Sequence, residues 1–207
     1  MRLLNTTSLE IQEFKNDSIP RYAILSHTWD EVEVTIQDMK GASAIERKGY
    51  EKVKRCCSIA RSHQYNYVWM DTCCIDNQSS AELSEAINSM YRWYQDADVC
   101  YAYLADVAHD PVRQSSRLIS PELSKSKWFC RGWTLQELIA PLEVIFLNED
   151  WKEIGTKSTL RDTVSSITGI PVDILAGNND VDSVSVAQRM SWAAGRVTTR
   201  RKIVPIA

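Results

Sequence analysis

The segment that decides the fold is Tyr67-Val68-Trp69-Met70-Asp71, a short apolar run that ends on a carboxylate. A run of this length and composition predicts a buried strand. Apolar residues recur at helical spacing before it, within residues 44–62. A second helix is expected after it, because Ser79-Ser80-Ala81-Glu82 has the pattern of a capping box. A strand between two helices is the repeating unit of an α/β fold.

The same alternation continues along the chain. We expect further strands at 22–26, 99–104 and 144–147, and further helices at 134–140, 160–169 and 183–196. Residues 106–126 have no clear period, which predicts a long loop. Tyr91 and Tyr94 should lie on the apolar stripe of the helix after Ser79, and Val186, Met190 and Ala193 should face inward. The fold class is therefore α/β, with a mainly parallel central sheet flanked by helices.

Composition and charge limit the kind of protein. The 207 residues suit one domain, and a net charge of −3 argues against nucleic-acid binding through bulk charge. No segment approaches about 18 consecutive apolar residues, so no membrane span is expected, and the N-terminus lacks the pattern of a signal peptide. The six cysteines include no Cys-x-x-Cys pair, which predicts buried, reduced thiols and no metal site. We expect a cytoplasmic protein.

Candidate site residues follow the predicted strands, at the edge where parallel sheets bind their ligands. The side chains expected there are Ser26, His27, Trp29, Asp71, Thr72, Asp76, Trp128, Arg131 and Trp133, followed by the helix that starts at Thr134 and carries Glu137. No glycine-rich phosphate loop of either common pattern is present, which argues against a nucleoside triphosphatase and an ordinary dinucleotide dehydrogenase.

Several of these residues have a structural alternative. Glu137 completes a capping box with Thr134, so it suits either helix capping or catalysis. Trp128 and Trp133 suit the core as well as a surface on which a ligand stacks. Asp71 suits a loop cap or a site, and His27 could form a nucleophilic pair with a nearby cysteine.

Three blocks of sequence resemble the fungal heterokaryon incompatibility (HET) domain, over roughly residues 1–200. They are Arg21-Tyr22-Ala23-Ile24-Leu25-Ser26-His27-Thr28-Trp29, then Tyr67-Val68-Trp69-Met70-Asp71-Thr72-Cys73-Cys74-Ile75-Asp76, and Trp128-Phe129-Cys130-Arg131-Gly132-Trp133-Thr134-Leu135-Gln136-Glu137-Leu138. The first block departs from the family pattern, because no glycine separates Trp29 from Asp30. The end of the chain also departs from it, and residues 201–207 are expected to be a short, truncated tail after a single domain at 1–200.

HET domains are in turn similar to TIR domains at a remoter level. The similarity rests on residues 133–138, where plant TIR domains carry a Trp-Cys-Leu-Asp-Glu-Leu-like segment with a glutamate that is catalytic for NAD⁺ cleavage. Carried over by position, that glutamate is Glu137, and the serine at the end of the first TIR strand is Ser26. The implied fold is flavodoxin-like or TIR-like, with insertions specific to HET domains.

The resemblance implies an effector of fungal non-self recognition that triggers programmed cell death. One mechanism is cleavage of NAD⁺ as a substrate, with no permanently bound cofactor. In that mechanism Trp29, Trp128 or Trp133 could stack on a ring, Arg131 could hold a phosphate, and Asp71 belongs to the binding site. The other mechanism is non-catalytic signalling by self-association and partner recruitment. Homo-oligomerisation on activation is expected, with a NACHT/STAND-type partner or a downstream module of that type.

Overall fold

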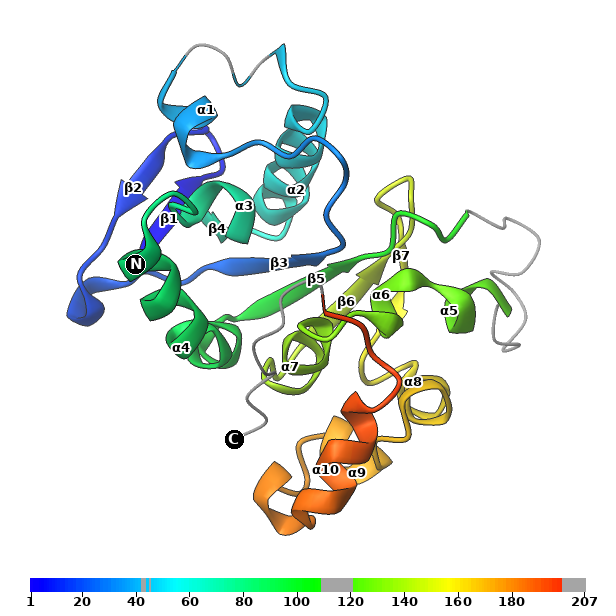
Figure 1. The fold of residues 1–207 in the computed structure, drawn as a ribbon. Helices are drawn as coiled ribbons and strands as arrows, with labels where there is room; N and C mark the ends of the chain where they lie inside the picture. The colour runs from blue at the N-terminus through cyan, green and yellow to red at the C-terminus, as the bar shows by residue number, and fades with distance from the viewer. Residues whose placement is uncertain (42–43, 45, 109–120, 199–207) are drawn as a thin grey trace. The chain divides into compact units, whose positions relative to one another are not determined.

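The fold was analysed in a computed structural model, which describes residues 1–41, 44, 46–108 and 121–198. The chain forms two compact units, Met1–Cys100 and Tyr101–Ala207. The predicted tail at 201–207 lies outside the described residues, and the single domain at 1–200 stays a prediction. Each unit is described by itself below (Figure 1).

The first unit alternates strands and helices after an initial pair of strands. Its strands are β1 (Arg2–Asn5), β2 (Ile11–Glu13), β3 (Ala23–His27), β4 (Tyr67–Trp69) and β5 (Val99–Tyr103), the last of which crosses into the second unit. Its helices are η1 (Asn16–Ser18), α1 (Ile36–Lys40), α2 (Tyr50–Ser62), α3 (Asp71–Cys74) and α4 (Ser80–Asp96). The predicted strands at 22–26, 67–71 and 99–104 are therefore confirmed, as are the helices on either side of β4.

The sheet contains both parallel and antiparallel pairs. In the first unit the strand order is β2-β1-β4-β3-β5. β3 runs parallel to β4, with Ala23 opposite Val68 and Ile24 opposite Trp69. β1 pairs antiparallel with both β2 and β4. The predicted α/β class is confirmed, whereas the antiparallel strands before residue 22 were not predicted, because their short polar-flanked segments carry little periodic signal.

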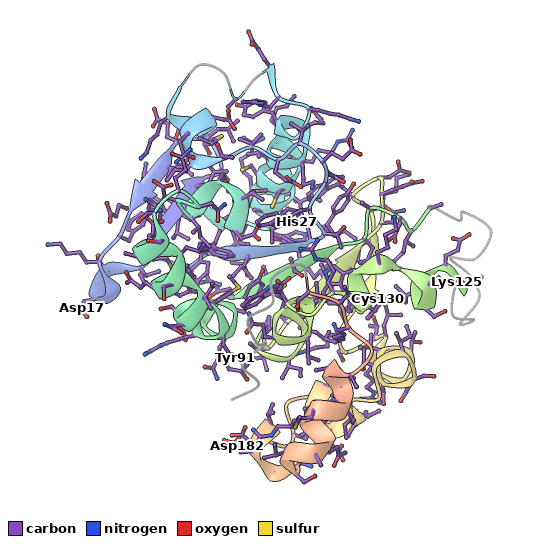
Figure 2. The ribbon with its side chains drawn as sticks, viewed as in Figure 1. Asp17, His27, Tyr91, Lys125, Cys130 and Asp182 are labelled. Atoms are coloured by element: carbon purple, nitrogen blue, oxygen red, sulfur yellow. The ribbon has the colours of Figure 1, made fainter. Side chains whose placement is uncertain are left out.

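Helices α2 and α4 cover opposite sides of the strands of the first unit (Figure 1). The Trp69 ring of β4 lies 5.5 Å from that of Trp93 and 5.9 Å from that of Tyr94, both on α4. The Tyr94 hydroxyl donates to the Leu25 carbonyl. Tyr94 is buried, as predicted for the apolar stripe of α4. Tyr91 is 38% exposed, so the prediction is wrong for this residue, which lies on the solvent-facing side of the helix (Figure 2).

The second unit continues β5 with a hairpin and a series of helices. Its further elements are α5 (Pro121–Lys125), α6 (Lys127–Cys130), α7 (Thr134–Ile139), β6 (Val144–Leu147), β7 (Glu153–Thr156), α8 (Arg161–Thr168), α9 (Val172–Leu175), η4 (Val181–Ser183) and α10 (Val186–Ala193). β6 and β7 pair antiparallel. The loop predicted at 106–126 contains helix α5, and its residues 109–120 lie outside the described part of the chain.

Helix α10 packs differently from the prediction. Val186 is 62% exposed and Met190 is 63% exposed, so the expectation that these two side chains face inward is wrong. Trp192 takes the buried position, with 3% exposure. The larger indole removes more apolar surface from water than the other two side chains, and a helix of eight residues has room to bury only one narrow face.

Two further predictions concern membranes and thiols. Among the described residues, none of the helices has the length and apolar character needed to cross a membrane. All six cysteines are free thiols, as predicted, and Cys130 is the exposed one (Figure 2).

Candidate functional site

The parallel pairing of β3 with β4 brings His27 and Asp71 together. His27 is the last residue of β3, and Asp71 is the first residue of α3, which begins directly after β4. Parallel strands end at the same edge, so residues that are 44 positions apart in sequence meet there. The His27 Nε2 atom lies 3.0 Å from Asp71 Oδ1.

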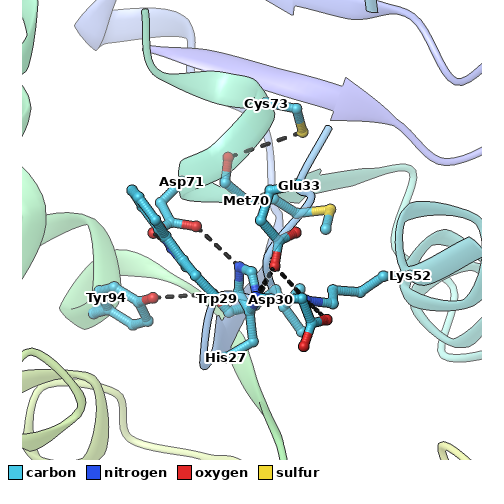
Figure 3. A network of polar contacts seen from close by, with 10 residues as sticks. His27, Trp29, Asp30, Glu33, Lys52, Met70, Asp71, Cys73 and Tyr94 are labelled. Atoms are coloured by element: carbon cyan, nitrogen blue, oxygen red, sulfur yellow. Dashed lines mark hydrogen bonds and ion pairs between the residues drawn. The ribbon is translucent and has the colours of Figure 1, made fainter. Parts of the chain in front are cut away.

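A lysine occupies the other side of the His27 ring (Figure 3). The Lys52 Nζ atom, from α2, lies 3.2 Å from His27 Nδ1 and 2.6 Å from Glu33 Oε1. It also lies 2.8 Å from Asp30 Oδ2. An ammonium group only donates, so Nδ1 accepts and the ring proton sits on Nε2, where it is donated to Asp71. The contacts thus hold the His27 ring from both sides, with Nε2 facing an acceptor and Nδ1 facing a donor.

Asp71 also holds the indole of Trp29. The Trp29 Nε1–H donates to Asp71 Oδ2 over 2.8 Å. Trp29 is nevertheless 44% exposed, so part of its aromatic surface faces solvent while the polar edge is anchored. A large apolar side chain held in place at the surface is a feature of binding sites, because little conformational entropy remains to be lost when a ligand stacks on it.

We call this connected set the His27 network. It consists of His27, Trp29, Asp30, Glu33, Lys52 and Asp71. Burial raises the pKa of Asp71, but the hydrogen bonds that its carboxylate accepts from His27, Trp29 and the Thr72 backbone N–H outweigh this effect and lower the pKa below its ordinary value. Asp71 is therefore a carboxylate at neutral pH, and it accepts hydrogen bonds through both oxygens.

The proposed pairing of His27 with a cysteine is not favoured by this geometry. Both ring nitrogens of His27 already have partners, Asp71 and Lys52. Cys73, close to Asp71 in sequence, contacts the Met70 carbonyl at 3.9 Å. The hydrogen bond with Cys74, together with burial, raises the pKa of the Cys73 thiol well above its usual range. A protonated thiol is a poor nucleophile.

Glu137 lies in the second unit, in the first turn of α7, and is 7% exposed. The capping box predicted for Thr134 and Glu137 does not form, because the N-cap residue is Trp133. The Glu137 N–H donates to the Trp133 carbonyl at 3.4 Å. The Thr134 hydroxyl instead donates to the Trp128 carbonyl. The predicted capping box of Thr134 and Glu137 is therefore wrong, whereas Glu137 does lie in the first turn of α7, where a carboxylate complements the helix dipole.

The remaining candidates near Glu137 differ in exposure. Trp128 has no exposed surface and packs edge-to-face on Phe129 and Phe146, which favours the core alternative for this side chain. Arg131 and Trp133 are half-buried at the turn between α6 and α7. Both stay predictions as binding residues.

The structure brings Trp29, His27 and Asp71 together within the first unit, as predicted for the strand ends. Ser26 is a fully buried residue of β3, also in the first unit. Glu137 belongs to the second unit. The catalytic roles that the TIR resemblance implies for Ser26 and Glu137 therefore stay predictions, one for each unit. No group of three or more His, Cys, Asp or Glu side chains in the described ranges could hold a metal ion.

Comparison with known proteins decides the family. Residues 22–122 match a family model described as heterokaryon incompatibility protein (HET). A protein of Podospora anserina, named Vegetative incompatibility protein HET-E-1, is 45% identical over 195 residues, which are 92% of this chain. The chain belongs to the HET family. It spans 14% of the length of the Podospora relative, and no solved structure matches this HET domain.

The part of the HET domain that matches the family model contains the whole His27 network, whereas Glu137 follows it in sequence. Sequence reasoning missed three members of that network, Lys52, Glu33 and Asp30. One signal was available for Lys52: it lies four residues before Cys56 and eight before Ala60, on the buried side of α2. No local pattern identifies Glu33 or Asp30, because their partner is distant in sequence.

Proposed function

We propose that this chain is an effector domain of heterokaryon incompatibility that triggers programmed cell death when unlike fungal cells fuse. The observation that carries the proposal is its 45% identity, over 195 residues, to a protein named for vegetative incompatibility. The chain covers 14% of that protein, which leaves room for other modules. A NACHT/STAND-type module or partner, which would bring copies of the domain together, is part of the proposal.

The proposed mechanism is hydrolysis of NAD⁺ at the nicotinamide–ribose bond, with Glu137 as the catalytic carboxylate. Water attacks the anomeric carbon, the C–N bond breaks, and its electron pair neutralises the pyridinium nitrogen. Nicotinamide then leaves as a neutral molecule and needs no acid, and the water gives up a proton as ADP-ribose forms. A carboxylate would stabilise the positive charge that develops on the ribosyl centre. Glu137 suits this role because it is a largely buried carboxylate, 7% exposed, in the first turn of α7.

The anchored indole of Trp29 supports a role in binding. Its exposed face could stack on a planar ring of a ligand, while Asp71 keeps its orientation. Half-buried Arg131 could hold a phosphate of the dinucleotide, because a guanidinium group forms paired hydrogen bonds with phosphate oxygens. NAD⁺ is the substrate in this proposal and not a resident cofactor.

The test is incubation of the purified chain, at high concentration, with NAD⁺. Released nicotinamide is measured by chromatography for the wild type, Glu137→Gln, and Glu153→Gln as a matched control on the exposed face of β7. We expect release by the wild type and the control, and loss of release in Glu137→Gln with an unchanged circular dichroism spectrum. Equal release by all three proteins would exclude Glu137 from the chemistry, and no release by the wild type would remove the enzymatic mechanism.

A second mechanism, non-catalytic signalling by self-association, is favoured by one observation. Val186 and Met190 are large apolar side chains on α10 that remain 62% and 63% exposed. A second copy of the chain could cover them. The double variant Val186→Lys/Met190→Lys separates the mechanisms in fungal cells. If toxicity requires these two residues and survives Glu137→Gln, signalling is the mechanism, and the reverse pattern supports catalysis.

A further inference from the structure

We propose that Arg196 is a positioning residue for Glu137: it holds the start of α7, the helix that carries Glu137, and acts on the Glu137 carboxylate through its charge. This inference rests on the proposed role of Glu137 in catalysis. Arg196 lies shortly after α10, and nothing in the sequence marks it as part of a site, because it begins a run of basic residues that would suit a solvated surface.

The Arg196 side chain reaches the turn from which α7 begins. Its Nη1 donates to the Arg131 carbonyl and to the Thr134 hydroxyl, each over 3.0 Å. Its Nε donates to the Trp192 carbonyl over 3.2 Å. Thr134 is the first residue of α7, and Glu137 follows it by three positions in the same turn. One guanidinium group therefore connects the end of α10 to the first turn of the helix that carries Glu137.

The backbone beside Arg196 strengthens the connection. The Val197 N–H donates to the Cys130 carbonyl over 2.7 Å, and the Gly132 N–H donates to the Val197 carbonyl over 3.0 Å. These bonds form a parallel bridge between Arg131 and Val197. The segment that follows α10 is thus held by main-chain bonds to the turn before α7, which keeps the guanidinium group in a defined position.

Charge adds a second effect to this geometry. Burial lowers the pKa of Arg196 to about 10, and the nearby Cys130 and Glu137 oppose that change. The side chain is therefore still a cation at neutral pH. Coulombic attraction is mutual, so the guanidinium favours the carboxylate form of Glu137. That form is the one that can stabilise a developing positive charge on a ribosyl centre.

Lysine could supply the charge but not the three hydrogen bonds. A guanidinium group presents five N–H donors in a planar fork, whereas an ammonium group ends a flexible stem as a point charge. Arg196→Lys is therefore expected to preserve the charge effect and lose the positioning. Arg196→Gln is expected to lose both. Arg189→Gln is the matched control, because Arg189 lies on α10 and pairs with Asp182.

Two measurements test the inference. The first is the titration of the Glu137 carboxyl carbon by NMR, assigned by comparison with Glu137→Gln. Its midpoint should move upward in Arg196→Gln and stay near the wild-type value in Arg196→Lys and Arg189→Gln. The second is the rate of NAD⁺ cleavage. The kcat should fall about 10- to 100-fold in Arg196→Gln, with KM within about twofold, and several-fold in Arg196→Lys.

The outcomes separate the two proposals. If the wild type cleaves no NAD⁺, the enzymatic mechanism fails, and the titration alone still decides whether Arg196 acts on Glu137. An unchanged midpoint in folded Arg196→Gln overturns the inference. If that variant does not fold, Arg196→Lys decides. A kcat of Arg196→Lys equal to that of the wild type overturns the positioning role. If the wild type is inactive, amide exchange in α7 is measured instead, and an unchanged exchange rate in Arg196→Lys overturns the role.

Discussion

Removal of Asp71 tests whether the His27 network stabilises the first unit. In Asp71→Ala the Nε2–H of His27, whose side chain is 1% exposed, loses its acceptor. A buried donor without a partner costs about 1–3 kcal/mol. The Trp29 indole is 44% exposed, so water replaces Asp71 there and the added loss is only about 0.5 kcal/mol. We expect the free energy of unfolding to fall by about 2–3 kcal/mol.

The assay is urea unfolding followed by circular dichroism and tryptophan fluorescence, with a thermal midpoint as a second measure. A loss of this size should lower the midpoint by about 4–12 °C for a chain of this length. Asp98→Ala is the matched control, because Asp98 pairs with the exposed Arg21 and should contribute little. A stability of Asp71→Ala equal to that of Asp98→Ala would refute the reasoning that His27 needs this acceptor.

Three further predictions concern pH, the core and backbone conformation. The pKa of Asp71 is lower in the folded chain than its ordinary value of 3.8. The contribution of Asp71 to the free energy of unfolding is therefore complete above that pH and is lost as the pH falls through the lowered value. Acid unfolding should depend less steeply on pH in Asp71→Asn. Trp128→Ala should lower the free energy of unfolding by about 3–5 kcal/mol, because the ring is fully buried, and a loss under 1 kcal/mol in a urea titration would contradict its core role. Gly155→Ala should destabilise more than Gly169→Ala in the same assay. Both have positive φ, but the new Cβ at Gly155 would lie 2.8 Å from Leu160 Cγ, whereas at Gly169 it meets nothing within 4 Å.

Much of the secondary structure was predictable from local patterns. Strands β3, β4, β5 and β6 are short apolar runs, and α4 and α8 show helical spacing, so each element carries its own signal. The sequence also predicted that residues at the ends of β3 and β4 lie close together, and His27 and Asp71 do so. Parallel pairing is the physical reason: it places the ends of both strands at one edge.

Which face of a helix is buried was less predictable. Periodicity shows which residues share a face, as for Val186 and Met190, but not whether a neighbouring element covers it. Tyr91 on α4 and these two residues on α10 are exposed for that reason. The predicted capping role of Thr134 is also wrong, because its hydroxyl donates to backbone carbonyls of the preceding turn and accepts from the distant Arg196.

The amino-acid sequence by itself determined the α/β class, the positions of most strands and helices, and the HET motifs, because these depend on neighbouring residues. Only the tertiary structure decided that Lys52 and Asp71 hold the two nitrogens of His27 from opposite sides. It also decided that Arg196 reaches the first turn of α7 across 62 positions. Hydrogen bonds and charges act over a few ångströms of space, and only the folded chain brings residues so distant in sequence within that range.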